Sequence, residues 1–146
     1  MTIRARRLGY HPLLNLGDLG IAYQHTTVNV VGSYLRSDWD VVRRFLKAYM
    51  EAIYLFRADK QFTQQVLSAF AQSDDADLLE ETWQLYALQY LERVPYPTLE
   101  GIQTVLNESP NPAAKDARPE QFVDLRLMQE LDAAGYFEEL RARYGD

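Results

Sequence analysis

The chain of 146 residues is long enough for about one domain, and a hydrophobic fraction of 47% excludes a disordered protein. Its formal net charge of −6 argues against an extended nucleic-acid interface, which needs clustered cations. The absence of cysteine excludes disulfides, thiolate metal sites and cysteine nucleophiles. No apolar run approaches the roughly 20 residues that a membrane-spanning helix needs, so we expect no membrane insertion.

The first seven residues carry the one basic cluster of the chain, Arg4, Arg6 and Arg7. Three cations without interleaved aromatic residues make no track for a nucleic acid, so a solvated terminus is the favoured interpretation. A contact with an anion is the alternative. No apolar segment follows these arginines, and the chain is therefore predicted to carry no secretory signal peptide.

Two short strands are predicted before residue 36. Residues His11–Leu16 form the first, ended by Gly17 to Gly20, and the β-branched stretch Thr26–Tyr34 forms the second. The apolar run Val28–Val31 is typical of a strand with neighbours on both sides. Two short strands do not make a stable sheet alone, so we expect the neighbouring strands to come from outside this chain.

From Ser37 onward the apolar spacing is helical almost throughout. Ser37 is predicted to cap a first helix, followed by one at Asp59–Ala71 and a third from Ser73–Asp75 to Tyr90. Proline at 95 and 97 stops the third helix because proline lacks the amide hydrogen. The apolar stripe of the first helix comprises Val41, Val42, Phe45, Ala48, Tyr49, Ala52, Ile53 and Phe56.

The remaining helices are shorter. Thr98 caps a fourth helix, and the proline-rich stretch at 109–112 is predicted to be a loop. Pro119 begins a fifth helix that runs through Leu131 and ends at Gly135, and a last amphipathic segment spans Tyr136 to Tyr144. The whole pattern predicts an α/β class, dominated by five to six helices and with two short strands.

No group of residues predicts catalysis. The chain has two histidines, His11 and His25, without carboxylates at a metal-binding spacing, and it contains no phosphate loop, GxSxG or HExxH motif. The acidic residues Glu80, Glu81 and Glu92 are explained by a solvated helix face. We therefore expect no enzyme activity, no metal and no cofactor.

Aromatic residues recur on the predicted helical stripes. Because aromatic side chains bury large areas, we expect these residues to pack in a core rather than to form a stacking platform. They are Phe45, Tyr49, Phe56, Phe62, Phe70, Trp83, Tyr86 and Tyr90.

A polar group precedes the second predicted strand. His25 lies beside Tyr23, Gln24, Thr26 and Thr27. These side chains could hydrogen-bond a small ligand, but a loop histidine with a backbone partner is the favoured interpretation.

Four segments in order resemble a known family: Gly9–Leu14, Val28–Ala52, Pro97–Gln103 (PTLEGIQ) and Pro119–Asp124 (PEQFVD). Within the second, Val42, Phe45, Leu46, Lys47, Ala48, Glu51 and Ala52 resemble a "V-x-x-F-L-K-A-x-x-E-A" helix that follows a strand. The family is the nitrate/sulfonate/taurine type of ABC-importer solute-binding protein, also known as the thiamine-precursor-binding type. The resemblance extends from about Arg6 to Gly135.

The resemblance implies the C-terminal part of a type II periplasmic-binding-protein fold, in which two α/β lobes close on a solute. Residues 1–36 would hold the short strands and the lobe-crossing segment, and residues 37–146 a helical region packed on the first lobe. Tyr23, His25, Thr26 and Thr27 are the candidate ligand-binding residues. The implied partners are a small organic solute and an ABC permease, and the implied location is the periplasm or the extracellular surface.

The chain departs from the family pattern. It has no lipobox cysteine, and the first-lobe strands that usually supply most ligand contacts are not among these residues. We therefore expect no solute binding by these residues alone. The alternative is a freestanding helical interaction domain whose exposed strand edge pairs with another chain or a second copy. Enzyme activity is the least favoured hypothesis, although precursor-synthesising proteins related to this family share the fold that the resemblance implies.

Overall fold

The computed structural model describes residues 2–145, except for the side chains of Thr2 and Leu16. The described chain is all-helical, with eight α-helices and no strand. The helices are α1 (Thr2–Arg7), α2 (Gly32–Ser37), α3 (Trp39–Ala58), α4 (Lys60–Ala71), α5 (Ala76–Leu85), α6 (Leu99–Glu108), α7 (Arg126–Ala133) and α8 (Tyr136–Tyr144). Short 3₁₀ turns occur at Leu16–Leu19 (η1), Pro112–Asp116 (η3) and Pro119–Phe122 (η4), and a π turn, Tyr86–Tyr90 (η2), extends α5.

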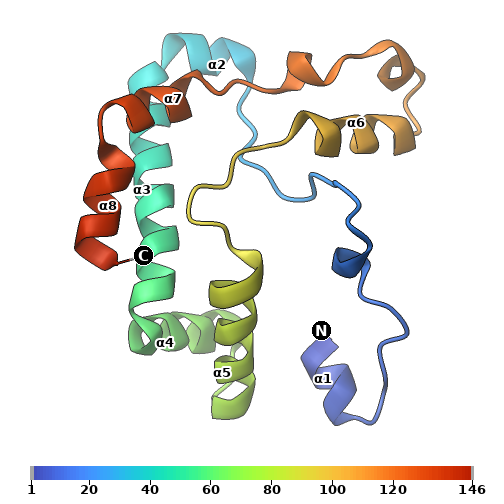
Figure 1. Cartoon of the computed structure of the whole chain (residues 1–146), viewed down its shortest axis with the longest axis vertical. Helices are drawn as coiled ribbons and strands as arrows, with labels where there is room; N and C mark the ends of the chain where they lie inside the picture. The colour runs from blue at the N-terminus through green and yellow to red at the C-terminus, as the bar shows by residue number, and fades with distance from the viewer. Residues whose placement is uncertain (1, 146) are drawn as a thin grey trace.

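The long helix α3 organises the molecule. Helices α7 and α8 pack along one side of it, and α4 and α5 lie at its lower end (Figure 1). Residues 8–31 run as an irregular segment along the opposite edge, from α1 to α2, and α6 packs with η3 and η4 beside the upper part of this segment (Figure 1). None of the helices in the described part of the chain is both long enough and apolar enough to span a membrane.

The predicted α/β class is wrong, and so are the type II periplasmic-binding-protein fold implied by the resemblance and both predicted strands. A strand is held by a ladder of hydrogen bonds to a neighbouring strand, and no ladder forms along residues 26–31 of the described chain. The nearest backbone contact is a single bond from Gln24 N–H to Gly101 O, at 3.3 Å. β-branched residues therefore keep this segment extended without making it a strand, and Tyr34 lies in α2 instead.

The core forms between α3, α7 and α8. It comprises Met50, Ile53, Tyr54, Met128, Leu131, Tyr136, Phe137 and Leu140. The Tyr136 hydroxyl donates to Lys47 O at 2.9 Å, which fixes α8 to α3. Gly135 has φ 75°, a left-handed conformation that lets the chain reverse between α7 and α8. The prediction that Gly135 ends the preceding helix is confirmed.

Three helix starts follow their local capping signals. Asp59, Asp75 and Thr98 each accept a backbone N–H of the first turn, at the starts of α4, α5 and α6. The cap predicted at Ser37 is wrong, because Ser37 ends α2 and Asp38 precedes α3.

The predicted fifth helix is also wrong, because two separate elements replace it. After η4 the backbone is extended at Val123, and α7 begins at Arg126. Asp124 accepts the Arg126 backbone N–H at 3.1 Å and satisfies a donor of the first turn of α7. Asp124 thus stabilises the start of a new helix, α7, within a segment whose apolar spacing predicts one continuous helix.

The prediction of an aromatic core is wrong, because none of the eight residues named belongs to the buried core. Phe70 is 89% exposed and Phe45 52% exposed. Trp83 is half-buried, and its Nε1–H donates to Phe56 O at 2.9 Å. Helix α3 therefore has two apolar faces: α7 and α8 cover one, and the face with Val41, Phe45 and Tyr49 stays largely exposed in the described chain.

The basic N-terminus is helical, and its three arginines are solvent-exposed, as predicted for a solvated terminus. Helix α1 packs against α5, and Arg7 forms an ion pair with Asp75, the capping residue of α5. Arg4 and Arg6 remain exposed.

Candidate solute-binding cavity

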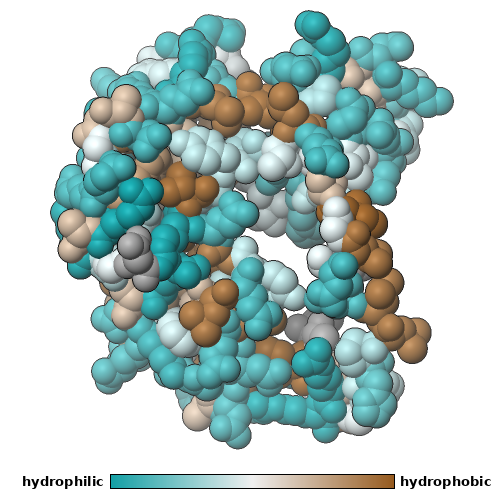
Figure 2. Space-filling model, viewed as in Figure 1, coloured by the Kyte–Doolittle hydropathy of each residue, from teal (hydrophilic) through white to brown (hydrophobic). Residues whose placement is uncertain are grey.

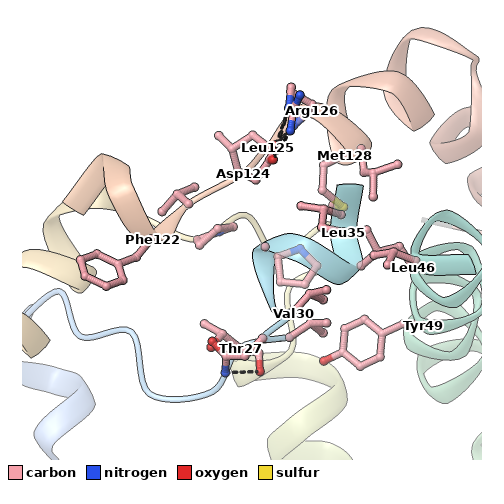
Figure 3. A pocket seen from close by; sticks show the side chains of 18 of the residues that line it. Thr27, Val30, Leu35, Leu46, Tyr49, Phe122, Asp124, Leu125, Arg126 and Met128 are labelled. Carbon is pink, nitrogen blue, oxygen red and sulfur yellow. Dashed lines mark hydrogen bonds and ion pairs between the residues drawn. The ribbon is translucent and has the colours of Figure 1, made fainter. Parts of the chain in front are cut away.

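A cavity of about 580 Å³ lies between the extended N-terminal segment and the helical bundle. Its walls come from residues 24–36, from α3, from the proline-rich loop at 95–97 and from residues 121–128. This volume falls within the roughly 300–1,000 Å³ of sites for small organic molecules. Side chains from these distant segments face one space in Figure 3.

One side of the cavity is apolar. Helix α3 contributes Val42, Leu46 and Met50, and α2 contributes Leu35. Figure 3 shows Leu35, Leu46 and Met128 clustered on this side. The wall is therefore continuous with the hydrophobic core, which contains Met50 and Met128.

The opposite side is formed by the extended segment and carries hydrogen-bonding groups. Thr26, Thr27 and Asn29 line it, and Asn29 Nδ2 donates to Thr27 O at 3.4 Å. Gln24 fixes the segment to α6, because its Oε1 accepts the Thr98 backbone N–H at 3.1 Å. Tyr49 points from α3 toward the wall with Thr27 and Val30 (Figure 3).

A charged pair lies at another edge of the cavity. Arg126 donates through Nε and Nη2 to the Asp124 carboxylate, at 2.9 and 2.6 Å. The hydrogen bond from Arg126 holds the pKa of Asp124 below its ordinary value, and Asp124 in turn raises the pKa of Arg126. Both groups stay charged at neutral pH, and the two opposite charges compensate each other. The pair therefore contributes fixed polar groups to the wall but no net charge.

The structure separates the four candidate residues proposed from the sequence. Thr26 and Thr27 line the cavity, whereas Tyr23 and His25 are exposed outside its lining. His25 Nδ1 lies 3.1 Å from Thr26 Oγ1, so its partner is a neighbouring side chain rather than the backbone group expected. The Tyr23 and His25 rings lie 6.4 Å apart.

Tyr49, Asp124 and Arg126 also line the cavity, although the sequence does not predict them as site residues. Tyr49 was predicted to pack in the core because it falls on an apolar stripe. Asp124 belongs to the PEQFVD segment, but its spacing alone does not indicate that residues 121–128 approach residues 24–36. No local sequence pattern predicts that residues 121–128 and 24–36 line the same cavity.

The wall combines apolar side chains with a small number of polar and charged groups. Its described residues include no histidine, cysteine, serine or lysine. No cluster of three or more side chains able to hold a metal ion occurs among the described residues. Apolar surface with a few fixed hydroxyl, amide and charged groups provides burial and orientation for a small molecule.

Comparisons of the chain with protein-family models, curated proteins and solved structures find no match. The family resemblance therefore rests on the sequence segments alone.

Proposed function

We propose that this chain is part of a solute-binding protein that captures a small organic molecule and delivers it to an ABC permease in the periplasm or at the extracellular surface. The observation that carries the proposal is the 580 Å³ cavity, whose wall includes Thr26 and Thr27. These two residues are candidates from the sequence, before any geometry is considered. The ordered family-like segments support the same function.

The composition of the wall indicates the kind of solute. Val42, Leu46 and Met50 would cover an apolar body, and the hydroxyls of Thr26 and Thr27 would fix a polar group. The solute would therefore carry both an apolar part and a hydrogen-bonding head group.

The rim of the cavity is open on the side of the extended segment. Val28 and Val30 are 40% and 37% exposed, and Val31 is 72% exposed. In the proposal, another part of the binding protein covers these side chains and closes the cavity. This is why solute binding is expected of the complete gene product rather than of these residues alone.

A thermal-shift panel of sulfonates, pyrimidines and flavin-like compounds tests the proposal on the complete gene product. A solute at 100 times its Kd is expected to stabilise the protein by about 2.7 kcal/mol, which raises Tm by several degrees. If every class leaves Tm unchanged at millimolar concentration, the proposed function is wrong.

A second candidate function, a protein-interaction or self-associating domain, is favoured by one observation. Large apolar side chains are exposed along the extended segment: Leu8, Tyr10, Leu13, Leu14, Leu19, Ile21, Tyr23, Val28, Val30 and Val31. Figure 2 shows hydrophobic surface along the edge where this segment runs. Contiguous exposed apolar surface of this kind marks interaction sites.

This candidate predicts self-association at micromolar concentration, measured by size exclusion with light scattering. Val31→Asp places a charge in the segment and is expected to shift the protein to monomer, whereas Phe70→Asp on the exposed side of α4 is the matched control. A monomer at every concentration, with wild type and both variants alike, would contradict it.

A further inference from the structure

A second cavity, of about 110 Å³, lies where the ends of α3 and α8 meet the chain after η2. Tyr54 and Arg57 of α3, Arg93 and Tyr144 form its wall, with Leu88 as an apolar flank. None of these residues lines the larger cavity. The feature is therefore independent of the proposed solute site.

Tyr54 is the first observation that points to a ligand. It is 2% exposed, and its hydroxyl has no hydrogen-bond partner. A buried hydroxyl without a partner is costly, and such groups in native proteins are almost always satisfied by protein, water or a ligand. A donor is thus available within the cavity wall.

The two arginines are the second observation. Arg57 donates from Nη1 to Leu91 O at 2.8 Å, which leaves its other donors free. Arg93 is half-buried and forms no hydrogen bond or ion pair with the described residues. Burial, and then the charge of Arg93, lower the pKa of Arg57. Among the described residues, no carboxylate forms an ion pair with either of these two like charges.

The described wall of the cavity carries two cationic side chains and no acidic one. The C-terminal ends of α3 and α8 contribute partial negative charges of about half an electron each, which is less than two full guanidinium charges. The carboxylate bonded to the wall residue Tyr144 belongs to Glu51, which accepts from Tyr144 Oη at 2.8 Å and from Arg143 Nη1 at 2.6 Å. Its charge is therefore already matched by Arg143.

We propose that this cavity binds a small oxyanion, with Arg57, Arg93 and the Tyr54 hydroxyl as donors. Guanidinium groups present paired N–H donors that match the oxygens of phosphate or sulfate. The anion would relieve the repulsion between the arginines and would satisfy the Tyr54 hydroxyl. The small volume favours the anionic group itself over a large organic body.

Isothermal titration with inorganic phosphate, against sodium chloride at equal ionic strength, tests the site. Arg93→Gln is expected to weaken phosphate binding by about 10- to 100-fold, and Tyr54→Phe by about 2- to 10-fold, because charged donors contribute more than a neutral hydroxyl. Arg6→Gln, on the exposed side of α1, is the matched control and is expected to leave affinity unchanged. Phenyl phosphate as a second probe distinguishes a free ion from a phosphate carried on a larger molecule.

Tyr54→Phe also separates binding from folding. It removes the unpartnered hydroxyl and keeps the ring, so without phosphate this variant is expected to be at least as stable as wild type. Phosphate that acts no differently from chloride, or that binds Arg93→Gln and Tyr54→Phe as tightly as wild type, would overturn the proposal.

Discussion

Replacing Phe137 by alanine is expected to lower the free energy of unfolding by about 3–5 kcal/mol, the usual cost of removing a buried phenylalanine. Phe137 is 1% exposed and lies in the core between α3, α7 and α8. Truncation leaves a cavity that the surrounding helices fill only in part. Urea unfolding followed by circular dichroism measures the loss.

Phe70→Ala is the matched control for this core. Phe70 lies on an apolar stripe of α4 but is 89% exposed. Its truncation is expected to change stability by no more than about 0.5 kcal/mol. Equal losses in the two variants would show that the core does not lie where the structure places it.

Replacing Gly101 by alanine is expected to detach the N-terminal segment from α6. A Cβ at this position would lie 2.7 Å from Thr98 Oγ1 and 3.0 Å from the backbone nitrogen of Gln24. Both atoms are fixed partners: Thr98 Oγ1 caps α6, and Gln24 N–H donates to Gly101 O. Overpacking of this kind costs about 1–3 kcal/mol, and it displaces Gln24, a residue of the solute cavity wall.

Gly32→Ala is the control for Gly101→Ala. A Cβ at Gly32 would meet only Arg36 Nη1, at 3.5 Å, which is an ordinary contact. Gly32 begins α2, where alanine favours the helix. Unfolding experiments and hydrogen exchange at the Gln24 amide compare the two variants. If Gly101→Ala keeps both the stability and the amide protection of wild type, the close approach of residues 24 and 101 is absent.

Signals that act over a few residues were predicted well. Thr98 caps α6 as predicted, and Asp75, within the predicted Ser73–Asp75 cap, caps α5, because each side chain reaches an N–H only three residues ahead. Gly135 ends a helix because glycine adopts positive φ without strain. These predictions need no information about the rest of the molecule.

Features that depend on distant partners were predicted poorly. Val28–Val31 has the composition of a strand, but the described chain offers no neighbouring strand to pair with it. Phe45 and Tyr49 share an apolar stripe with Ile53, yet the periodicity cannot say which side of α3 meets α7 and α8. The same limit applies to the cavity: Thr26 and Thr27 were candidates from local polarity, whereas Asp124 and Arg126 join the wall only through the fold.

The most direct test of the solute-binding account is a titration of the complete gene product with the solute found in the thermal-shift panel. The double variant Thr26→Val and Thr27→Val removes two hydroxyls from the cavity wall with little change in shape, and Thr104→Val removes one from α6, outside the cavity. Each hydroxyl bonded to the solute contributes about 0.5–1.5 kcal/mol, so the double variant is expected to bind about tenfold more weakly, while Thr104→Val binds as wild type does. Equal affinity of the double variant and Thr104→Val would contradict the assignment of this cavity as the solute site.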